Sequence, residues 1–202
     1  TGSGKTTTLY STLNKLEKPD INIVTIEDPI EFDLENINQA QVNKKSGVTF
    51  AAALRSILRQ DPDIIMVGEV RDEETVELAI RAALTGHLVF STIHTNDAAS
   101  GFARLLNWDI EPFLIASTVK GILAQRLVRR ICENCKVEHE ITDREALLLK
   151  IDKKKYKKTY KGKGCLSCRN SGYRGRLGLY ELLVVNEDVS ELVLNEEPSF
   201  KI

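Results

Sequence analysis

The sequence begins with Thr-Gly-Ser-Gly-Lys-Thr-Thr-Thr, and no other stretch limits the possible folds as strongly. Gly4, Lys5 and Thr6 match the end of the pattern G-x-x-x-x-G-K-[ST], a loop whose backbone N–H groups surround phosphates. In such a loop the lysine bridges the β- and γ-phosphates and the hydroxyl group ligates Mg²⁺, so we predict these roles for Lys5 and Thr6. The predicted phosphate-binding set is Gly2, Ser3, Gly4, Lys5, Thr6 and Thr7. The first glycine of the pattern would lie two residues before Thr1, and we expect the sequence to be a piece of a longer protein.

Apolar runs and helical periodicities alternate along the first 130 residues. Strands are predicted at about 21–26, 39–42, 63–69 and 87–93. Helices are predicted at about 5–18, 49–60, 73–85, 97–106 and 112–130, with Asp72 as the N-cap of the third. The alternation predicts an α/β fold in which helices cover a parallel sheet. Further on, we expect helices at 143–150 and 187–194 and a strand at 176–185.

Carboxylates follow two of the predicted buried strands. Glu27 and Asp28 end the first strand, and Glu69 ends the third. Ligands of open α/β sheets bind at the carboxyl ends of the strands. Phosphoryl transfer to water needs Mg²⁺ against the phosphates and a carboxylate that orients or deprotonates the water. We predict catalytic roles for Glu27 and Glu69 and a cofactor-binding role for Asp28, and leave open which glutamate is the general base; the alternative is that these residues cap turns.

Two histidines flank the predicted strand at 87–93. His94 stands at its carboxyl end, where its side chain could reach a γ-phosphate and report its loss, so we count it among the catalytic candidates. His87 stands at the other end, and a structural role is equally compatible with the sequence.

The charge distribution divides the chain. Residues 1–119 contain 10 Lys and Arg against 17 Asp and Glu, whereas residues 120–176 contain 17 against 6 and residues 177–202 contain 1 against 6. All four cysteines lie in the basic block. We therefore predict a core at 1–130, a small module at 131–176 and the start of a C-terminal region at 177–202.

The cysteines form two C-x-x-C pairs with 29 residues between them. Four thiolates in this pattern are typical of a structural Zn²⁺ site, with the ligands Cys132, Cys135, Cys165 and Cys168. Two disulfides or a redox pair are the alternatives, and a reducing compartment disfavours both.

A lysine-rich segment, KKKYKKTYKGKG, lies at 153–164 between the two pairs. Basic residues interleaved with tyrosines can bind nucleic acid or an acidic membrane. We favour a solvated loop and expect no direct nucleic-acid partner. No apolar run approaches the ~20 residues of a transmembrane helix.

Five motifs together resemble one family of motor proteins. In chain order they are TGSGKTTTLYSTL, TIEDPIEF, LRSILRQDPDIIMVGEVRDEET, ALTGHLVFSTIHTNDA and QRLVRRICENCK. They are similar to the ATPases that drive type II secretion and type IV pilus assembly, and the resemblance covers residues 1 to about 193. It implies a RecA-like P-loop NTPase domain that uses ATP and Mg²⁺. It also implies a homohexamer of the full-length parent, cytoplasmic and docked on platform proteins of the inner membrane.

By position, the resemblance assigns Lys5 and Thr6 to the phosphate loop and Glu27 with Asp28 to the family's Asp box. Glu69 matches its Walker-B glutamate, and His87 and His94 fall in its His box. The cysteines resemble a zinc module that secretion and pilus-extension members have and retraction motors generally lack. This favours the assembly class.

The sequence also departs from the family pattern. Asn107-Trp108-Asp109 replaces a common Met-Gly. The resemblance implies that an N-terminal domain supplies most arginines that reach the γ-phosphate in trans, and we expect that domain to lie outside this sequence. We therefore expect this chain alone to be weak or inactive as an ATPase. The alternatives are a related motor for DNA uptake or conjugation, and a zinc-bearing interaction module with a vestigial nucleotide site.

Overall fold

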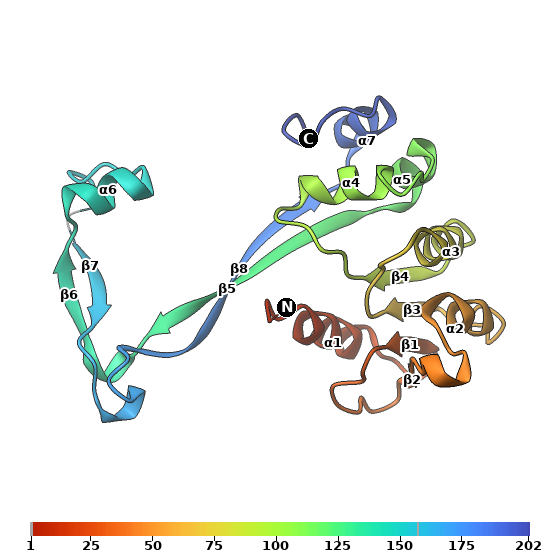
Figure 1. The fold of residues 1–202 in the computed structure, drawn as a ribbon, viewed down its shortest axis with the longest axis horizontal. Coiled ribbons are helices and arrows are strands. Elements are labelled where there is room, and N and C mark those ends of the chain that lie inside the picture. The colour runs from red at the N-terminus through yellow and green to blue at the C-terminus, as the bar shows by residue number, and fades with distance from the viewer. Residues whose placement is uncertain (1, 157) are drawn as a thin grey trace. The chain divides into compact units, whose positions relative to one another are not determined.

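A parallel four-stranded sheet organises the larger part of the protein (Figure 1). The computed structural model describes residues 2–156 and 158–202. The strands are β1 (Ile23–Glu27), β2 (Asn38–Gln41), β3 (Ile64–Val67) and β4 (Leu88–Ser91), in the spatial order β2-β1-β3-β4. Each neighbouring pair runs parallel, so all four carboxyl ends lie along one edge.

The two central strands are buried along their whole length. Every residue of β1 and β3 is buried, whereas the outer strands β2 and β4 are partly exposed. Continuous apolar runs are typical of parallel strands covered on both faces. The prediction of buried strands at 21–26 and 63–69 is thus confirmed, and these strands form the centre of the sheet.

Five helices accompany this sheet along the chain: α1 (Lys5–Leu16), α2 (Phe50–Ile57), α3 (Glu73–Leu84), α4 (Ala99–Leu106) and α5 (Pro112–Thr118). The Thr49 side chain accepts a hydrogen bond from Ala52 N and caps α2. Asp72 accepts one from Thr75 N and caps α3, as predicted. These caps satisfy N–H groups that lack partners within the helix.

Alternate residues of the central strands supply two separate cores. Ile26 and Val67 pack with Leu54 of α2, Phe102 of α4 and other apolar side chains. Ile23 and Met66, one residue out of phase, pack with Tyr10 and other residues of α1. Since successive strand residues point to opposite faces, α1 covers one face of the sheet and α2 covers the other.

The chain divides into two compact units. The first comprises Thr1–Gln125 and Tyr180–Ile202, and the second comprises Arg126–Leu179. Strands β5 (Gly121–Ile131) and β8 (Tyr173–Val184) pair with each other, and both unit boundaries fall within them. Helix α7 (Glu187–Leu194), capped by Asn186, belongs to the first unit and confirms the helix predicted at 187–194.

The second unit contains a hairpin and one helix. Strands β6 (Lys136–Glu140) and β7 (Lys158–Gly162) are antiparallel, and α6 (Asp143–Leu149) lies between them in the chain. A capping box of Thr142 and Glu145 starts α6. Two short 3-10 helices, Glu133–Cys135 and Leu166–Cys168, contain one cysteine of each pair.

The predicted helix at 112–130 is wrong after its first seven residues. Helix α5 ends at Thr118, and β5 begins at Gly121. A Cβ on Gly121 would lie 3.1 Å from the Leu183 carbonyl oxygen, so the backbones of β5 and β8 approach each other closely at this residue. Apolar spacing at 119–131 also fits a helix, and the strand partner that decides the matter is about 60 residues away in the sequence.

Over the described residues, every helix is too short or too polar to cross a bilayer.

Core packing in the first unit predicts a matched pair of stability effects. Leu54 is fully buried in α2, whereas Leu84 at the end of α3 is 57% exposed. Leu54→Ala leaves a cavity and is expected to lower the free energy of unfolding by about 2–5 kcal/mol. Leu84→Ala is expected to change it by no more than about 0.5 kcal/mol. Urea denaturation of both variants tests this, and equal effects would contradict the described core.

Candidate functional site

The carboxyl edge of the sheet brings the glycine-rich loop to the ends of β3 and β4. Lys5 is the first residue of α1, and its Nζ lies 3.5 Å from His94 Nδ1, just beyond β4. The other ring nitrogen of His94, Nε2, lies 3.4 Å from Glu69 Oε2, just beyond β3. Three residues predicted from separate motifs therefore form one continuous line of contacts.

The loop itself has the backbone conformation that glycine allows. Gly2 and Gly4 have φ angles of 83° and 86°, in the left-handed region that other residues avoid. Gly4 is the N-cap of α1, no side chain caps the helix, and its first turn contains no acidic residue. Such a helix start offers N–H groups and a partial positive charge to an anion.

Glu69 is held in its ionised form by two neighbours. Its side chain is 14% exposed, and Arg71 Nη2 lies 2.5 Å from Oε1. Burial raises the pKa of Glu69, but hydrogen bonds from Arg71 and His94 outweigh it and hold the pKa below its ordinary value. In this state Glu69 is a hydrogen-bond acceptor rather than a strong base.

Arg71 is a member of this edge that sequence reasoning did not single out. Its hydrogen bond to Glu69 and the charge of Glu69 raise its pKa, with a smaller contribution from Asp28. Asp28 itself is exposed. An arginine two residues after a strand-end glutamate is the only signal in the sequence, and many solvated arginines share it.

Glu27 lies in a different network, beneath α1. It is 3% exposed and accepts hydrogen bonds from Tyr10 to Oε2, from Thr25 Oγ1 to Oε1 at 2.6 Å, and from Gln39 Nε2 to Oε1 at 3.1 Å. Among the described residues these donors occupy both oxygens, and none of them is Lys5, His94 or Glu69. The structure thus separates the two glutamates that the sequence left equivalent.

Close contacts and hydrogen bonds around Gly68 connect the ends of β1, β3 and β4. A Cβ on Gly68 would lie 3.3 Å from the Ile26 carbonyl oxygen and 3.4 Å from Glu27 Cα. Thr92 Oγ1 donates to the Gly68 carbonyl oxygen at 2.8 Å, and Val70 N donates to the Thr92 carbonyl oxygen at 3.0 Å. These bonds fix where Glu69 and His94 leave the sheet.

His87 has a local structural role. Its Nδ1 lies 2.9 Å from the Ala82 carbonyl oxygen and 3.2 Å from Thr85 Oγ1, at the end of α3. It precedes β4, at the opposite edge of the sheet from His94. His87 therefore contacts the last turn of α3 and lies away from the candidate site.

In the second unit, the four cysteines converge. All four are free thiols, and their sulfur atoms lie within 4.8 Å of one another. The Sγ–Sγ distances are 3.8 Å for Cys132–Cys165, 3.9 Å for Cys135–Cys168 and 3.7 Å for Cys165–Cys168. A tetrahedron with Zn–S bonds of 2.3 Å has edges of about 3.8 Å, so the donor set fits a Zn²⁺ ion.

Backbone donors around the sulfurs suit the same interpretation. Cys165 N and Gly172 N donate to Cys168 Sγ at 3.2 and 3.3 Å. Burial raises the pKa of Cys135 to about 12, whereas at Cys168 these N–H donors overcome the effect of burial and lower the pKa to about 6. Four adjacent thiols cannot all ionise without a cation between them.

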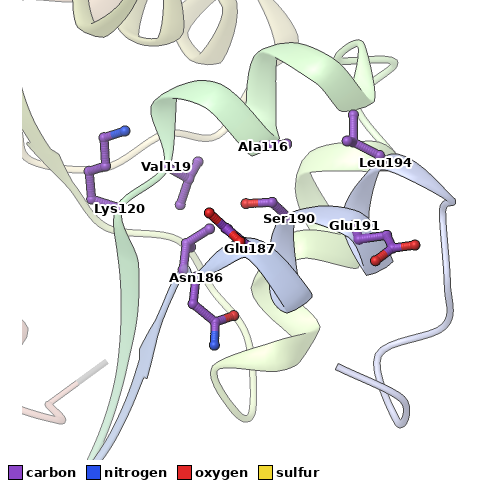
Figure 2. A pocket seen from close by; sticks show the side chains of 9 residues that line it. Ala116, Val119, Lys120, Asn186, Glu187, Ser190, Glu191 and Leu194 are labelled. Carbon is purple, nitrogen blue, oxygen red and sulfur yellow. The ribbon is translucent and has the colours of Figure 1, made fainter.

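A groove between α5 and α7 contains none of the predicted site residues. It has a volume of about 440 Å³ and includes Lys120, Glu187 and Glu191 in its lining. Figure 2 shows these side chains with Val119, Ser190 and Leu194 around the opening. The groove is distinct from the carboxyl edge of the sheet.

Fold and site together define an α/β protein in which a glycine-rich loop meets acidic strand ends. The sequence matches the family described as "Type II/IV secretion system protein" over residues 1–202, and the chain belongs to this family.

Two curated relatives and one solved structure illustrate the similarity. The type II secretion system protein E of Pseudomonas aeruginosa is 52% identical over 196 residues, which are 97% of this chain and 39% of that protein. The type IV pilus assembly ATPase PilB of Myxococcus xanthus is 54% identical over 198 residues, 96% of this chain and 35% of that protein. A crystal structure of the pilus retraction motor PilT with bound ADP superposes with a TM-score of 0.70 at 33% identity, covering 96% of this chain and 48% of that one.

The chain therefore spans 39% of the length of the secretion protein E and 35% of the length of PilB.

The network around Glu27 predicts a pH-dependent loss of stability. Burial, with the hydrogen bond to Glu27, raises the pKa of Tyr10 to about 12 from 10.0. Folding therefore favours the neutral phenol of Tyr10. The resulting contribution to the free energy of unfolding is complete below pH 10 and is lost as the pH rises toward 12. Tyr10→Phe is expected to cost about 1–3 kcal/mol near neutral pH and to flatten the fall in stability over that alkaline range.

Denaturation at a series of pH values measures both effects. Tyr180→Phe is the matched control, because Tyr180 is 61% exposed. If the two variants showed the same stability profile, the Tyr10–Glu27 contact would have no energetic role.

Proposed function

We propose that this chain is the nucleotide-hydrolysing part of a motor for type II secretion or type IV pilus assembly, with a RecA-like P-loop NTPase core. The contact line from Lys5 through His94 to Glu69 is the observation that supports hydrolysis most directly. Family membership and the printed functions of the relatives support the pathway. The substrate is ATP bound with Mg²⁺.

The phosphates bind at the start of α1. Gly2 and Gly4 allow the loop to turn its N–H groups inward, and Lys5 neutralises the β- and γ-phosphates. Thr6 supplies the hydroxyl ligand for Mg²⁺, which when bound stabilises the charge that develops on the transferred phosphoryl group. Ser3 and Thr7 complete the loop, and Asp28 adds a carboxylate at the end of β1.

We assign the attacking water to Glu69 rather than to Glu27. Glu69 adjoins the Lys5–His94 pair, and its ionised carboxylate can accept a hydrogen bond from water and orient it. Glu27 already accepts three hydrogen bonds in a buried setting, so we assign it the positioning of α1 and hence of Lys5. His94 contacts both Lys5 and Glu69 and can respond to the γ-phosphate.

The parent protein, in our proposal, forms a homohexamer at the cytoplasmic face of the inner membrane. It docks on membrane platform proteins and extrudes pilin or pseudopilin subunits. Two observations favour assembly over retraction: the four converging cysteines and the higher identity to the secretion and assembly relatives than to the retraction motor.

Removal of the Glu69 charge tests the proposed hydrolysis. In the full-length parent protein, Glu69→Gln is expected to lower the ATP turnover rate by about a hundredfold to ten-thousandfold, because the attacking water loses the carboxylate that orients it. Binding of Mg²⁺-ATP is expected to persist. Glu73→Gln, at an exposed glutamate of α3, is the control and should leave the rate unchanged. A Glu69→Gln variant with normal turnover would remove Glu69 from the mechanism.

We further propose that the four cysteines hold one structural Zn²⁺ per chain. The sulfur spacing and the N–H donors to Cys168 support this assignment. The four thiolates would provide a closed tetrahedral shell, which stabilises the second unit and leaves no coordination position for catalysis.

Metal analysis tests the zinc proposal. Purified protein is expected to contain one Zn²⁺ per chain, and Cys135→Ser is expected to lose most of it and to lower the melting temperature of the second unit. Ser167→Ala changes a neighbouring residue of the second knuckle without removing a thiol, and should retain the metal. Four titratable thiols with no metal in the unmutated protein would exclude the site.

A further inference from the structure

Three consecutive leucines form the exposed end of α6 in the second unit. Leu147, Leu148 and Leu149 are 79%, 72% and 64% exposed, whereas Ala146 before them is buried. The helix ends at this point, because its C-cap residue Lys150 adopts a left-handed conformation with a φ angle of 53°. Single exposed leucines are common on protein surfaces, but three adjacent ones form an apolar patch that marks an interaction site. We call residues 147–149 the leucine tip.

A dense group of lysines follows the leucine tip directly. Residues 150–163 contain eight lysines and one acidic residue, Asp152. The Asp152 side chain organises a turn, since its Oδ1 accepts a hydrogen bond from Lys154 N at 2.8 Å. Lys153 Nζ donates to Oδ1 of Asp143, in the first turn of α6, at 2.7 Å. This contact holds the lysine-bearing turn against the helix that ends in the leucine tip.

Most of the positive charge on this segment has no acidic partner. The ion pairs of Lys153 and Lys158 are exposed, and such pairs are weak. The other lysines of the segment that the structure describes form no ion pair with a described carboxylate. Tyr156 and Tyr160 lie among these lysines and are about half exposed, so each offers an apolar ring with a polar hydroxyl group.

A membrane surface with anionic lipids fits this combination better than a protein helix or a nucleic acid does. A helix that packs on another helix needs apolar residues at spacings of three and four, whereas three consecutive leucines spread around the helix end. Nucleic acid would attract the lysines but gives exposed leucines no apolar environment. At a membrane, apolar side chains insert at the boundary of headgroups and acyl chains, lysines attract anionic lipids, and tyrosine rings lie at headgroup level.

We propose that the leucine tip and the lysines of residues 150–163 bind the surface of a membrane that contains anionic lipids. The leucines insert at the headgroup boundary, and the lysines contact the lipid phosphates around them. This contact goes beyond ATP hydrolysis and rests on the proposed function only in placing the protein beside a membrane. It requires no nucleotide, because all of its residues belong to the second unit.

Co-sedimentation of the full-length parent protein with unilamellar vesicles tests the contact. Vesicles of equal parts phosphatidylcholine and phosphatidylglycerol are expected to bind the protein at least about a hundredfold more tightly than vesicles of phosphatidylcholine alone, because each lysine near an anionic surface contributes about fivefold. Binding to the anionic vesicles is expected to fall steeply from about 0.1 M to about 1 M salt, where the screening length decreases from about 10 Å to about 3 Å.

Paired substitutions separate the leucine tip from other exposed leucines. Leu148→Ser together with Leu149→Ser is expected to weaken binding to the anionic vesicles by about 10- to 100-fold, since two side chains no longer insert. Leu177→Ser together with Leu179→Ser changes two exposed leucines of β8 in the same unit and should leave binding within about twofold. An unchanged melting temperature of each variant verifies that the fold is kept.

A second pair of variants tests the lysines. Lys154→Gln together with Lys155→Gln is expected to weaken binding to the anionic vesicles by about 10- to 30-fold and to reduce its salt dependence. Lys44→Gln together with Lys45→Gln removes the same charge from an exposed 3-10 helix of the first unit, and should change binding by no more than about twofold.

Three results would overturn the inference. The first is an unmutated protein that does not bind the anionic vesicles, and the second is a leucine-tip variant that binds them normally. The third is short duplex DNA that displaces the vesicles and binds the leucine-tip variant as tightly as the unmutated protein, which would assign the surface to nucleic acid. Because vesicle binding is measured without nucleotide, a protein that binds vesicles but does not hydrolyse ATP would overturn the proposed function alone.

Discussion

The buried carboxylate of Glu27 is the constraint on which the rest of the carboxyl edge depends. A carboxyl group at this depth is stable only when hydrogen-bond partners surround it, and Tyr10, Thr25 and Gln39 provide them. Tyr10 belongs to α1, so satisfying Glu27 also fixes the helix whose first residue is Lys5. The position of Lys5, for which we propose phosphate binding, is thereby coupled to an acidic residue that does not contact it.

Most of the first unit could be predicted from local patterns. The buried runs at β1 and β3 and the Asp72 cap of α3 follow from residue types within a few positions of one another. Strand β5 could not be predicted, because its partner β8 is distant in sequence and its apolar spacing also fits a helix. Pairing between distant segments therefore decided an element that local reasoning placed wrongly. The same holds for β7, which pairs with β6 inside the lysine-rich segment where we favoured a solvated loop.

The candidate site likewise combines features that the sequence predicts with features that it does not. Lys5, Glu69 and His94 stand at element ends, and the parallel topology brings such ends together, so their proximity was predictable; their chemical roles stay predictions. The burial of Glu27 and the pairing of Arg71 with Glu69 depend on side-chain directions that the sequence does not encode locally. Tyr180 lines the same surface groove as Ser11 and Thr12 of α1, although about 170 residues separate it from them in the sequence, and no local motif reveals such a contact.

The placement of the unit boundaries within β5 and β8 has a consequence for how such a chain can change. Arg126–Leu179 leaves the first unit on one strand and returns to it on the neighbouring strand. Two antiparallel strands can be joined by a hairpin turn of about two residues. The cysteine-bearing unit is therefore an insertion between the paired strands β5 and β8. Its loss or gain during evolution would leave the strand order of the parallel sheet unchanged.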